Sequence, residues 1–379
     1  MSCKMNIAFL YIAEAYQCYH GASIALELAA RPGVNVVSYY NDPETPRHLE
    51  RIRMAYGTPP VAYRRLRRSP PTRLMQSIRI LGMFKEMVMR DNASELDQYD
   101  AIFTLEDTVA SARRLGIRRP KLIYSPHGFG DRARGFDARA AAFDFVLVAG
   151  DKSATRLLKS GLVTAADHAV IGPVKLEVSA RLRVQHRPFF KHQRPTVLYN
   201  AHKAPRLTSW HKFIEPMLGQ FGRQTRFNLI VAPHVKMFRR RSVSVRSMWE
   251  ARSTDTIIID TSSDRLMDMT YADAADIYVG DVSGQVYEFL AVPRPCVFLN
   301  ARGVQWRDDP NFAHWHLGDV VDDPKDLLSA IGSAPERHDF YRARQEIFAK
   351  ASLGDRSAGA AERGADAILD FMGRSASVR

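Results

Sequence analysis

The chain has 379 residues, of which 46% are hydrophobic and 25% are charged, a composition that is typical of folded globular proteins and excludes a disordered chain. This length predicts two domains, each able to bury its own core. The formal net charge of +13 predicts attraction to polyanions such as nucleic acids, anionic lipids or phosphorylated substrates, without choosing among them.

The beginning of the chain and its cysteines bear on the cellular compartment. The first residues lack the pattern of a cleaved signal peptide, and no stretch of about 18 apolar residues predicts a spanning helix. Cys3, Cys18 and Cys296 have no metal-ligand or disulfide spacing, so we interpret all three as structural. We therefore expect a cytoplasmic protein that contacts a membrane only peripherally.

Short apolar strands alternate with helices in the first half of the chain. A strand over 5–12, a helix over 21–30 and a strand over 34–40 predict a β-α-β opening. Strands that are apolar on both faces are typical of a parallel sheet. The remaining predicted elements of this half are strands over 101–105, 121–125, 143–149 and 169–171 and a helix over 155–159.

Residues 64–90 combine many arginines with Leu, Ile, Met and Phe at roughly helical spacing, which predicts a basic amphipathic helix. Two interpretations stay open for it. The helix could lie on an anionic membrane surface, or it could be an ordinary surface helix packed through its apolar stripe.

The second half repeats the alternation of strands and helices after a basic segment that is poor in aliphatic residues, 177–195, which we interpret as a linker. Two doubly wound sheets in tandem predict an α/β protein whose ligand-binding loops follow the carboxyl ends of the strands. The predicted elements are strands over 196–199, 227–231, 256–259, 277–279 and 296–299 and a helix over 210–221.

The segment 272–300 carries the strongest motif, because a predicted strand runs through Gly280-Asp281-Val282-Ser283-Gly284 directly into a helix. Free backbone N–H groups, the helix dipole and the Ser283 hydroxyl suit a pyrophosphate, and Gly284 permits close approach. The alternative is that Asp281 and Ser283 only cap the helix. We expect a nucleotide-activated substrate, here called the donor, to bind at Asp281, Ser283, Gly284 and Gln285 and to contact Glu288 through its ribose hydroxyls.

Two further histidines follow predicted strands. His127 stands in Ser125-Pro126-His127-Gly128 and could accept the proton of an acceptor hydroxyl, since a neutral imidazole is a good base. The alternative is a structural histidine that only forms hydrogen bonds. On the acceptor side we also place Gly128, Arg132, Arg134 and His20.

His234 ends Leu229-Ile230-Val231-Ala232-Pro233-His234 and would touch the donor phosphates or protonate the leaving phosphate. The segment 200–206, NAHKAPR, offers His202, Lys203 and Arg206 near the same phosphates. The alternatives are that His234 is a plain loop histidine and that the charged side chains of 200–206 are only solvated.

These motifs resemble the CDP-glycerol glycerophosphotransferases, the polymerases and primases of teichoic acids. The spacing of Asp281, Ser283, Glu288 and Pro295 fits their Asp, Ser, Ser, acidic, Pro pattern, although Gly284 replaces the second Ser, as in the Ser-Gly of UDP-N-acetylglucosamine 2-epimerases. His127-Gly128 resembles their His-Gly-Thr signature, whose histidine acts as a base. Two weaker likenesses are Pro233-His234 to an Arg-x-His-Pro segment and 358–363 to a helix start near the family's end.

The resemblance implies a GT-B fold, two Rossmann-like doubly wound domains that face each other across a cleft. We place an acceptor domain over 1–176, the linker over 177–195, a nucleotide-donor domain with C-terminal helices over 196–372, and a tail over 373–379. No metal-binding DxD motif ends a strand, so we expect no cofactor and no obligatory metal.

The function predicted is transfer of glycerol phosphate, or a related polyol phosphate, from a CDP-activated donor to a hydroxyl of a saccharide or lipid-linked acceptor. A GT-B glycosyltransferase using a UDP-, GDP- or CMP-sugar is the first alternative. A 2-epimerase would need cleft carboxylates, for which Asp131 and Glu106 are the evident candidates. Nucleic-acid binding rests on charge alone, without a recognised motif, so we expect no nucleic-acid partner.

Overall fold

The computed structural model describes residues 4–78, 81–128, 137–183 and 188–377, and these form two compact units. Unit 1 contains the chain up to Leu182 together with the segment Ser352–Arg379, and unit 2 contains Arg183–Ala351. The boundary lies inside the predicted linker 177–195. The C-terminal segment, however, belongs to unit 1 and not to the domain predicted over 196–372.

Unit 1 is built around a sheet that has seven strands among the described residues, in the order β3-β2-β1-β4-β5-β6-β7. Neighbouring strands are parallel, so their carboxyl ends share one edge, where ligands bind in such sheets. The strands are β1 (Met5–Tyr11), β2 (Val34–Tyr40), β3 (Ala62–Arg65), β4 (Ala101–Thr104), β5 (Lys121–Tyr124), β6 (Phe145–Val148) and β7 (His168–Val170).

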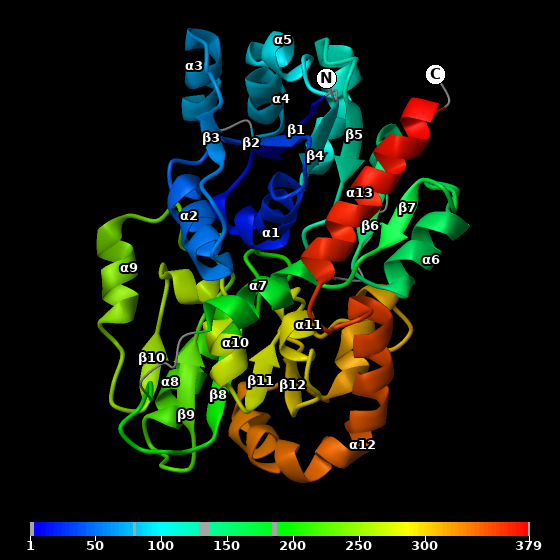
Figure 1. The fold of residues 1–379 in the computed structure, drawn as a ribbon. Helices are drawn as coiled ribbons and strands as arrows, with labels where there is room; N and C mark the ends of the chain where they lie inside the picture. Colours follow the sequence, from blue (N-terminus) through cyan, green and yellow to red (C-terminus); the bar gives the residue numbers. More distant parts are fainter. Residues whose placement is uncertain (1–3, 79–80, 129–136, 184–187, 378–379) are drawn as a thin grey trace. The chain divides into compact units, whose positions relative to one another are not determined.

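Helices cover the faces of this sheet. In α1, a Cβ atom on Gly21 would lie 2.9 Å from Cε1 of Phe103, so the glycine lets the helix lie directly against β4. The C-terminal α13 lies along unit 1 (Figure 1), where Phe371 stacks on Phe145 with ring centroids 4.6 Å apart. The α-helices are α1 (Cys18–Ala29), α2 (Thr45–Tyr56), α3 (Pro70–Ile78), α4 (Leu81–Asp91), α5 (Ala93–Leu96), α6 (Asp151–Lys159), α7 (Val174–Leu182) and α13 (Ala360–Ser377); the 3-10 helices are η1 (Ala15–Gln17), η2 (Asp107–Leu115) and η3 (Ala138–Ala142).

Two predicted segments have different structures. Residues 64–90 are not one helix: they end β3, turn, and then form α3 and α4. The Asn92 side chain fixes the turn through hydrogen bonds with the backbone N–H and carbonyl of Arg67. The predicted linker begins with the helix α7, whose Val178 and Leu182 are buried.

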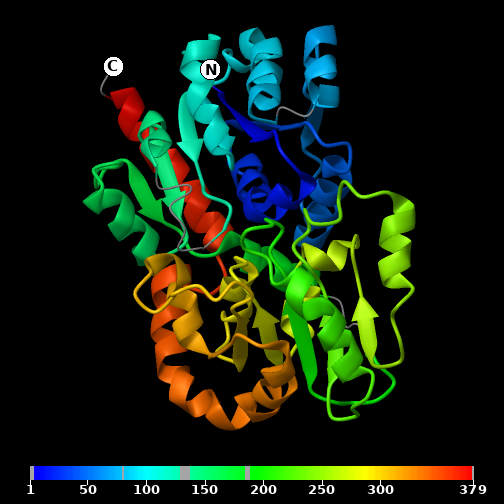
Figure 2. The same cartoon turned by 180° about the vertical axis from the view of Figure 1, so that it is seen from behind.

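The sheet of unit 2 has the order β10-β9-β8-β11-β12-β13 in the part of the chain that the structure describes, and its neighbouring strands are parallel. Figure 2 shows α8 over one face of this sheet, and buried Phe213 and Met217 of α8 belong to the same core as Val197 and Leu229 of the strands. The strands are β8 (Thr196–Asn200), β9 (Asn228–Val231), β10 (Ile257–Ile259), β11 (Ile277–Gly280), β12 (Cys296–Leu299) and β13 (Asp319–Val321). The helices are α8 (Trp210–Phe221), α9 (Val243–Glu250), η4 (Asp264–Leu266), α10 (Thr270–Ala274), α11 (Gln285–Phe289), η5 (Pro310–Leu317), η6 (Pro324–Asp326) and α12 (Leu327–Leu353), the last of which runs into unit 1 at Ser352.

Candidate active site

The loops that carry the predicted donor residues emerge side by side from unit 2. β8 lies between β9 and β11 in the sheet, and Asn200 at the end of β8 is in register with Gly280 at the end of β11. The loops after these three strands therefore meet at one sheet edge. They carry His202, His234 and Asp281.

Asp281 has a buried carboxylate, with only 1% of the residue exposed. Its oxygens accept hydrogen bonds from the backbone N–H of His202 (3.0 and 3.1 Å) and from the backbone N–H and hydroxyl of Ser209 (2.7 and 2.8 Å). Burial raises the pKa of Asp281 to about 6, against the hydrogen bonds from Ser209, His202 and Val282. The carboxylate thus holds the loop between β8 and α8 in place.

The backbone of Asp281 is also fixed. Its carbonyl accepts hydrogen bonds from Nε2 of His314 (3.1 Å) and from Nε1 of Trp315 (3.0 Å). Sequence reasoning missed both residues, because nothing in the local pattern of η5 marks them as partners of Asp281. His314, for example, lies 33 residues after Asp281 in the chain. The turn after β11 is consequently held from two sides.

The remaining predicted donor residues surround the start of α11. Ser283 is buried and Gly284 half-buried, and a Cβ atom built on Gly284 would meet nothing within 4 Å, so there is open space beside this backbone. The side-chain amide of Gln285 donates to the carbonyl of Leu266 at 3.1 Å. Glu288 is buried on α11, and its contact with ribose hydroxyls stays a prediction.

His202 and His234 form a pair, with ring centroids 5.7 Å apart and planes at 69°. Nδ1 of His202 accepts the backbone N–H of Ala204 at 3.0 Å, and Nδ1 of His234 accepts that of Lys236 at 3.1 Å. A nitrogen that accepts an N–H carries no proton, so each neutral ring has its proton on Nε2. Both side chains are therefore hydrogen-bond donors at Nε2.

The basic residues of the same loop are exposed. Lys203 and Arg206 lie at the surface, and Arg302 anchors the loop by donating to the carbonyl of Pro205 at 2.6 Å. Their predicted role as phosphate ligands stays a prediction.

In unit 1, His127 stands three residues beyond Tyr124, the last residue of β5. Its Nδ1 lies 2.6 Å from the carbonyl oxygen of Leu105. Because a carbonyl only accepts, Nδ1 carries the proton, and the neutral ring presents a lone pair at Nε2. Gly128 follows with a φ of 118°, a left-handed conformation that favours glycine and turns the chain away.

His20, the other predicted acceptor-side histidine, is buried in α1 with its ring centroid 6.4 Å from that of His127. Burial holds the pKa of His20 well below its usual range, and the charges of Lys175 and His127 lower it further. Arg132, Arg134 and the epimerase candidate Asp131 lie outside the described residues.

Glu106, the other epimerase candidate, is engaged in a buried network. Its Oε2 is 2.6 Å from Nζ of Lys85, and its Oε1 accepts from the side-chain amide of Gln17 at 2.9 Å. The residue is 3% exposed. Both oxygens of this carboxylate are thus engaged by side chains of unit 1.

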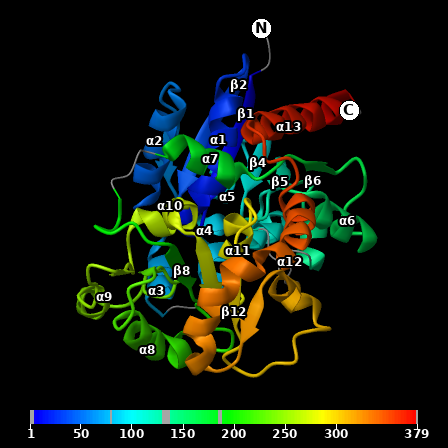
Figure 3. The same cartoon turned by 90° about the horizontal axis from the view of Figure 1, so that it is seen from below.

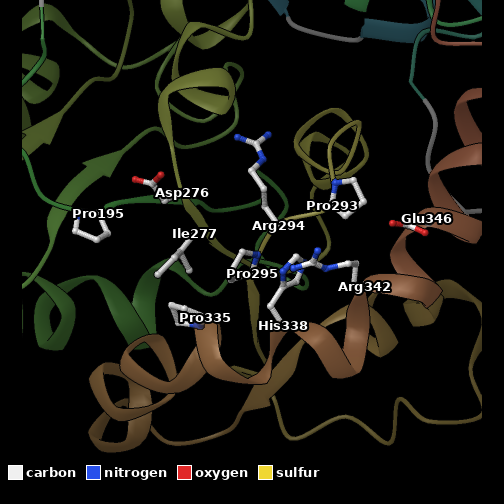
Figure 4. Close-up of a pocket in the computed structure, with 10 residues that line it drawn as sticks. All are labelled: Pro195, Asp276, Ile277, Pro293, Arg294, Pro295, Pro335, His338, Arg342 and Glu346. Carbon is white, nitrogen blue, oxygen red and sulfur yellow. The ribbon is translucent and has the colours of Figure 1, made fainter.

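A cavity of about 540 Å³ lies at the opposite edge of the second sheet, and Figure 4 shows the side chains that line it. Pro195, Ile277 and Pro295 line it at the amino ends of β8, β11 and β12. The guanidinium of Arg294 is occupied there by the carbonyls of Ala272, Ala275 and Phe289 (2.6 to 2.9 Å). This cavity is separate from the histidine-bearing edge, and the hydrogen bonds of Arg294 hold the surrounding chain in place.

Two further findings concern the described residues. No helix in the described ranges is both long and apolar enough to cross a membrane. A group of three or more His, Cys, Asp or Glu side chains able to hold a metal ion is likewise not found in those ranges; the expectation that no metal is required stays a prediction.

The architecture is that of a GT-B protein: two α/β units, each with a parallel sheet wound by helices. The solved structures that resemble it include UDP-GlcNAc 2-epimerase from Neisseria meningitidis bound to UDP-GlcNAc, with a TM-score of 0.69, 12% identity and coverage of 97% of this chain and 100% of that chain. The structure of S. aureus MnaA with UDP resembles it with a TM-score of 0.67 and 13% sequence identity, and the match covers 97% of each chain.

The wall teichoic acid polymerase TagF gives a TM-score of 0.62 at 9% identity, covering 98% of this chain and 90% of that chain. No protein-family model matches the sequence, and no curated protein matches it. At such identities the likeness establishes the GT-B fold, and the function has to be argued from the site.

Proposed function

We propose that the protein is a transferase that moves glycerol phosphate, or a related polyol phosphate, from a CDP-activated donor to a hydroxyl of a saccharide or lipid-linked acceptor. The observation that carries the proposal is the pair of opposite tautomers. His127 presents a lone pair at Nε2, as a base requires, whereas His202 and His234 present protons, as phosphate ligands require.

In this proposal unit 1 supplies the base. Nε2 of His127 takes the proton of the acceptor hydroxyl as its oxygen attacks the β-phosphorus of the donor. A new P–O bond forms, the bond from the β-phosphorus to the bridging oxygen breaks, and CMP leaves with that oxygen. The hydrogen bond from Nδ1 to Leu105 stays in place throughout and stabilises the imidazolium that forms.

Unit 2 binds the donor. The Nε2–H groups of His202 and His234 donate to phosphate oxygens, on which negative charge accumulates as the P–O bond breaks. Backbone N–H groups at Ser283 and Gly284, with the exposed charges of Lys203 and Arg206, add to this stabilisation. Asp281 contributes indirectly, because it fixes the loop that carries His202.

A GT-B glycosyltransferase that uses a UDP-, GDP- or CMP-sugar is the second candidate, favoured by the likeness to structures solved with UDP and UDP-GlcNAc. The same groups would act, but the acceptor oxygen would attack the anomeric carbon. A 2-epimerase is less well supported, because Glu106 is held by Lys85 and Gln17.

We further propose that the protein works at the inner face of the cytoplasmic membrane. Leu74 of α3 and Met83 of α4 are 61% and 53% exposed, and the exposed arginines of 64–90 lie in the same stretch, including Arg64 and Arg67, which both pair with Glu95. Apolar and basic side chains in one exposed region favour anionic lipid.

The test is a thermal-unfolding panel with CDP-glycerol, CMP, UDP-sugars, GDP-sugars and ADP, followed by analysis of the released nucleotide. A ligand that binds only the native state raises the unfolding temperature. Stabilisation by CDP-glycerol and release of CMP in the presence of an acceptor support the proposal. Stabilisation by a UDP- or GDP-sugar with release of a nucleoside diphosphate supports the glycosyltransferase, and no stabilisation by any nucleotide contradicts both.

A further inference from the structure

The helix α12 carries the two most exposed large apolar side chains in the described part of the chain. Phe340 and Ile347 are each 71% exposed. They stand seven residues apart, and Ala343, which is also exposed, follows Phe340 by three residues. Residues spaced by three and four lie on one face of a helix, so these three side chains form one apolar seam. Figures 1 and 3 show α12 on the outer side of unit 2.

The other side of the same helix fixes this seam in place. Gln345 is fully buried, and its side-chain amide donates to the carbonyl of Leu317 at 2.8 Å. The ring of Phe340 packs edge-on against that of Tyr341 with centroids 5.0 Å apart, and the hydroxyl of Tyr341 donates to Asp319 at 2.7 Å. A surface that is fixed in this way loses little conformational entropy when a partner covers it.

The exposed face continues beyond the seam with one charge at each end. Glu336 precedes Phe340 by four residues, Lys350 follows Ile347 by three residues, and both charged residues are exposed. The successive spacings along the face are therefore four, three, four and three, which is the seven-residue repeat of helices that pack in pairs. An exposed apolar stripe bordered by charged residues is typical of an interaction surface.

Two copies of this face complement each other when the two helices run antiparallel. With a two-fold axis beside Ala343, Phe340 of one copy packs against Ile347 of the other, and Glu336 of one copy meets Lys350 of the other. Ala343 faces its own equivalent, where its small side chain lets the helix axes approach closely. A parallel pair would instead place Glu336 beside Glu336 and Lys350 beside Lys350.

The charged residues beside the seam are engaged within unit 2. Arg337 forms an ion pair with Asp319 at 2.8 Å, and Arg344 donates to a backbone carbonyl of η5 at 2.9 Å. On the other side of the seam, Asp339 pairs with Arg342 at 3.0 Å. These contacts reduce the repulsion that like charges of two copies would cause at an antiparallel contact.

We propose that the protein forms a two-fold dimer in which residues 336–350 of two copies pack antiparallel. The apolar seam supplies the buried centre of the interface, and the pairs of Glu336 with Lys350 supply its polar rim. About four turns of helix bury less than the roughly 1,600 Å² of a standard stable interface. We therefore expect a Kd of about 1 to 100 μM. Association through α12 does not depend on the proposed function.

Sedimentation velocity of the full chain at about 1, 10 and 100 μM is the first test, and the wild type should change from monomer to dimer over this range. Phe340→Glu and Ile347→Glu should each raise Kd at least about 100-fold, because each substitution acts twice across the two-fold axis. Val243→Glu is the matched control, since it changes a side chain of α9 in the same unit that is 67% exposed. It should leave Kd unchanged.

Every other result of this experiment contradicts the dimer. A wild type that stays monomeric at the highest concentration overturns the proposal. A dimer that survives both Phe340→Glu and Ile347→Glu assigns association to a different surface and overturns it as well. Because both side chains lie in solvent, the unfolding temperatures of the variants at low concentration should match that of the wild type, which excludes loss of the fold as the cause.

The second test reverses the charges at the ends of the face. Glu336→Lys and Lys350→Glu should each raise Kd about tenfold, because both rim pairs change from attraction to repulsion. The double variant, in which the two charges are exchanged, should return to within about twofold of the wild type, since each pair is restored in reverse order. Unchanged Kd in both single variants, or no recovery in the double variant, would overturn the antiparallel packing. None of these substitutions touches the candidate active site, so a failure of the proposed function leaves both tests valid.

Discussion

His127 and His234 occupy the same local position in two different units. Tyr124 ends β5 and Val231 ends β9, so each histidine stands three residues beyond its strand, and each follows a proline. Yet Nδ1 of His127 donates to a carbonyl, whereas Nδ1 of His234 accepts an N–H. A single backbone partner thus decides whether the imidazole presents a lone pair or a proton.

The comparison shows that equivalent positions on two related sheets need not serve the same chemistry. The carbonyl of Leu105 belongs to the residue directly after β4 (Ala101–Thr104), and β4 neighbours β5, so the tautomer of His127 is set by another segment. The N–H of Lys236 comes from the turn that begins at His234 itself. The tautomer of His127 is therefore fixed by the segment that follows a neighbouring strand, and that of His234 by its own loop.

The largest expected effect is that of His127→Asn. The asparagine amide can keep the hydrogen bond to Leu105 but has no basic nitrogen at the position of Nε2, so kcat should fall by roughly 10²- to 10⁴-fold. The unfolding temperature should stay close to that of the wild type. Steady-state kinetics beside thermal unfolding test this; activity above a tenth of the wild type would show that His127 is not the base.

Asp281→Asn should mainly reduce stability. Its oxygens accept from two backbone N–H groups and one hydroxyl contributed by His202 and Ser209, and an amide places N–H groups among these donors. We expect a loss of about 3 kcal/mol in the free energy of unfolding, measured with urea. Asp326→Asn, at an exposed position, is the control and should change it little.

A smaller effect is expected when His234→Gln and His234→Asn are compared by their affinity for CDP-glycerol. Gln retains an N–H donor near the position of Nε2, whereas Asn retains only the acceptor for the N–H of Lys236. We expect Asn to weaken CDP-glycerol binding about tenfold more than Gln, the value of one hydrogen bond to a charged group. Calorimetric titration measures this, and equal affinities would mean that Nε2 of His234 does not touch the phosphates.

The stability of the protein should also depend on pH, because Asp281 titrates differently in the folded and the unfolded chain. The folded-state pKa of Asp281, about 6, exceeds its ordinary value of 3.8, so near pH 5 the folded chain holds a proton that the unfolded chain has lost. The free energy of unfolding should therefore decrease as pH rises from about 4 to 6, by up to about 3 kcal/mol. Subtracting the profile of Asp281→Asn isolates this contribution, and identical profiles would contradict it.

The titration of His20 should make stability rise with pH, which is the direction opposite to that expected for Asp281. Burial, Lys175 and His127 lower its pKa in the folded chain, so the unfolded chain takes up a proton that the folded chain refuses. This stability is present above the ordinary histidine pKa, near 6.5, and is lost as pH falls below it. A His20→Gln variant should lose less stability on acidification than the wild type, and an equal loss in both proteins would argue against a buried neutral His20.

Most of the fold could be predicted from the sequence, because its strands are apolar on both faces. The bounds of the strands from β1 to β12 were predicted within a residue or two, apart from those of the short edge strand β3. That strand was not predicted, because its arginines are not typical of a buried strand. The helix α7 was missed because its charged residues are typical of a linker. The membership of α13 in unit 1 depends on contacts such as Phe145 with Phe371, which no local pattern reveals.

For the candidate site, the sequence predicted which residues follow strand ends but not the contacts that these residues make. Histidines and small residues after strands mark the edge of a sheet, which identified His127, His234 and Ser283. The tautomers depend on partners such as Leu105, and the inward direction of Asp281 depends on Ser209.

The carboxylate of Asp281 also sets an order of events during synthesis of the chain. The loop it holds begins at His202, 79 residues earlier, and β8 obtains one of its two neighbours only when β11 is made. When synthesis has reached the end of α8, the loop after β8 therefore still lacks the carboxylate that holds it. The candidate donor site of unit 2 matures only after the second half of that unit emerges, whereas strands β1 to β7 of unit 1 are by then complete.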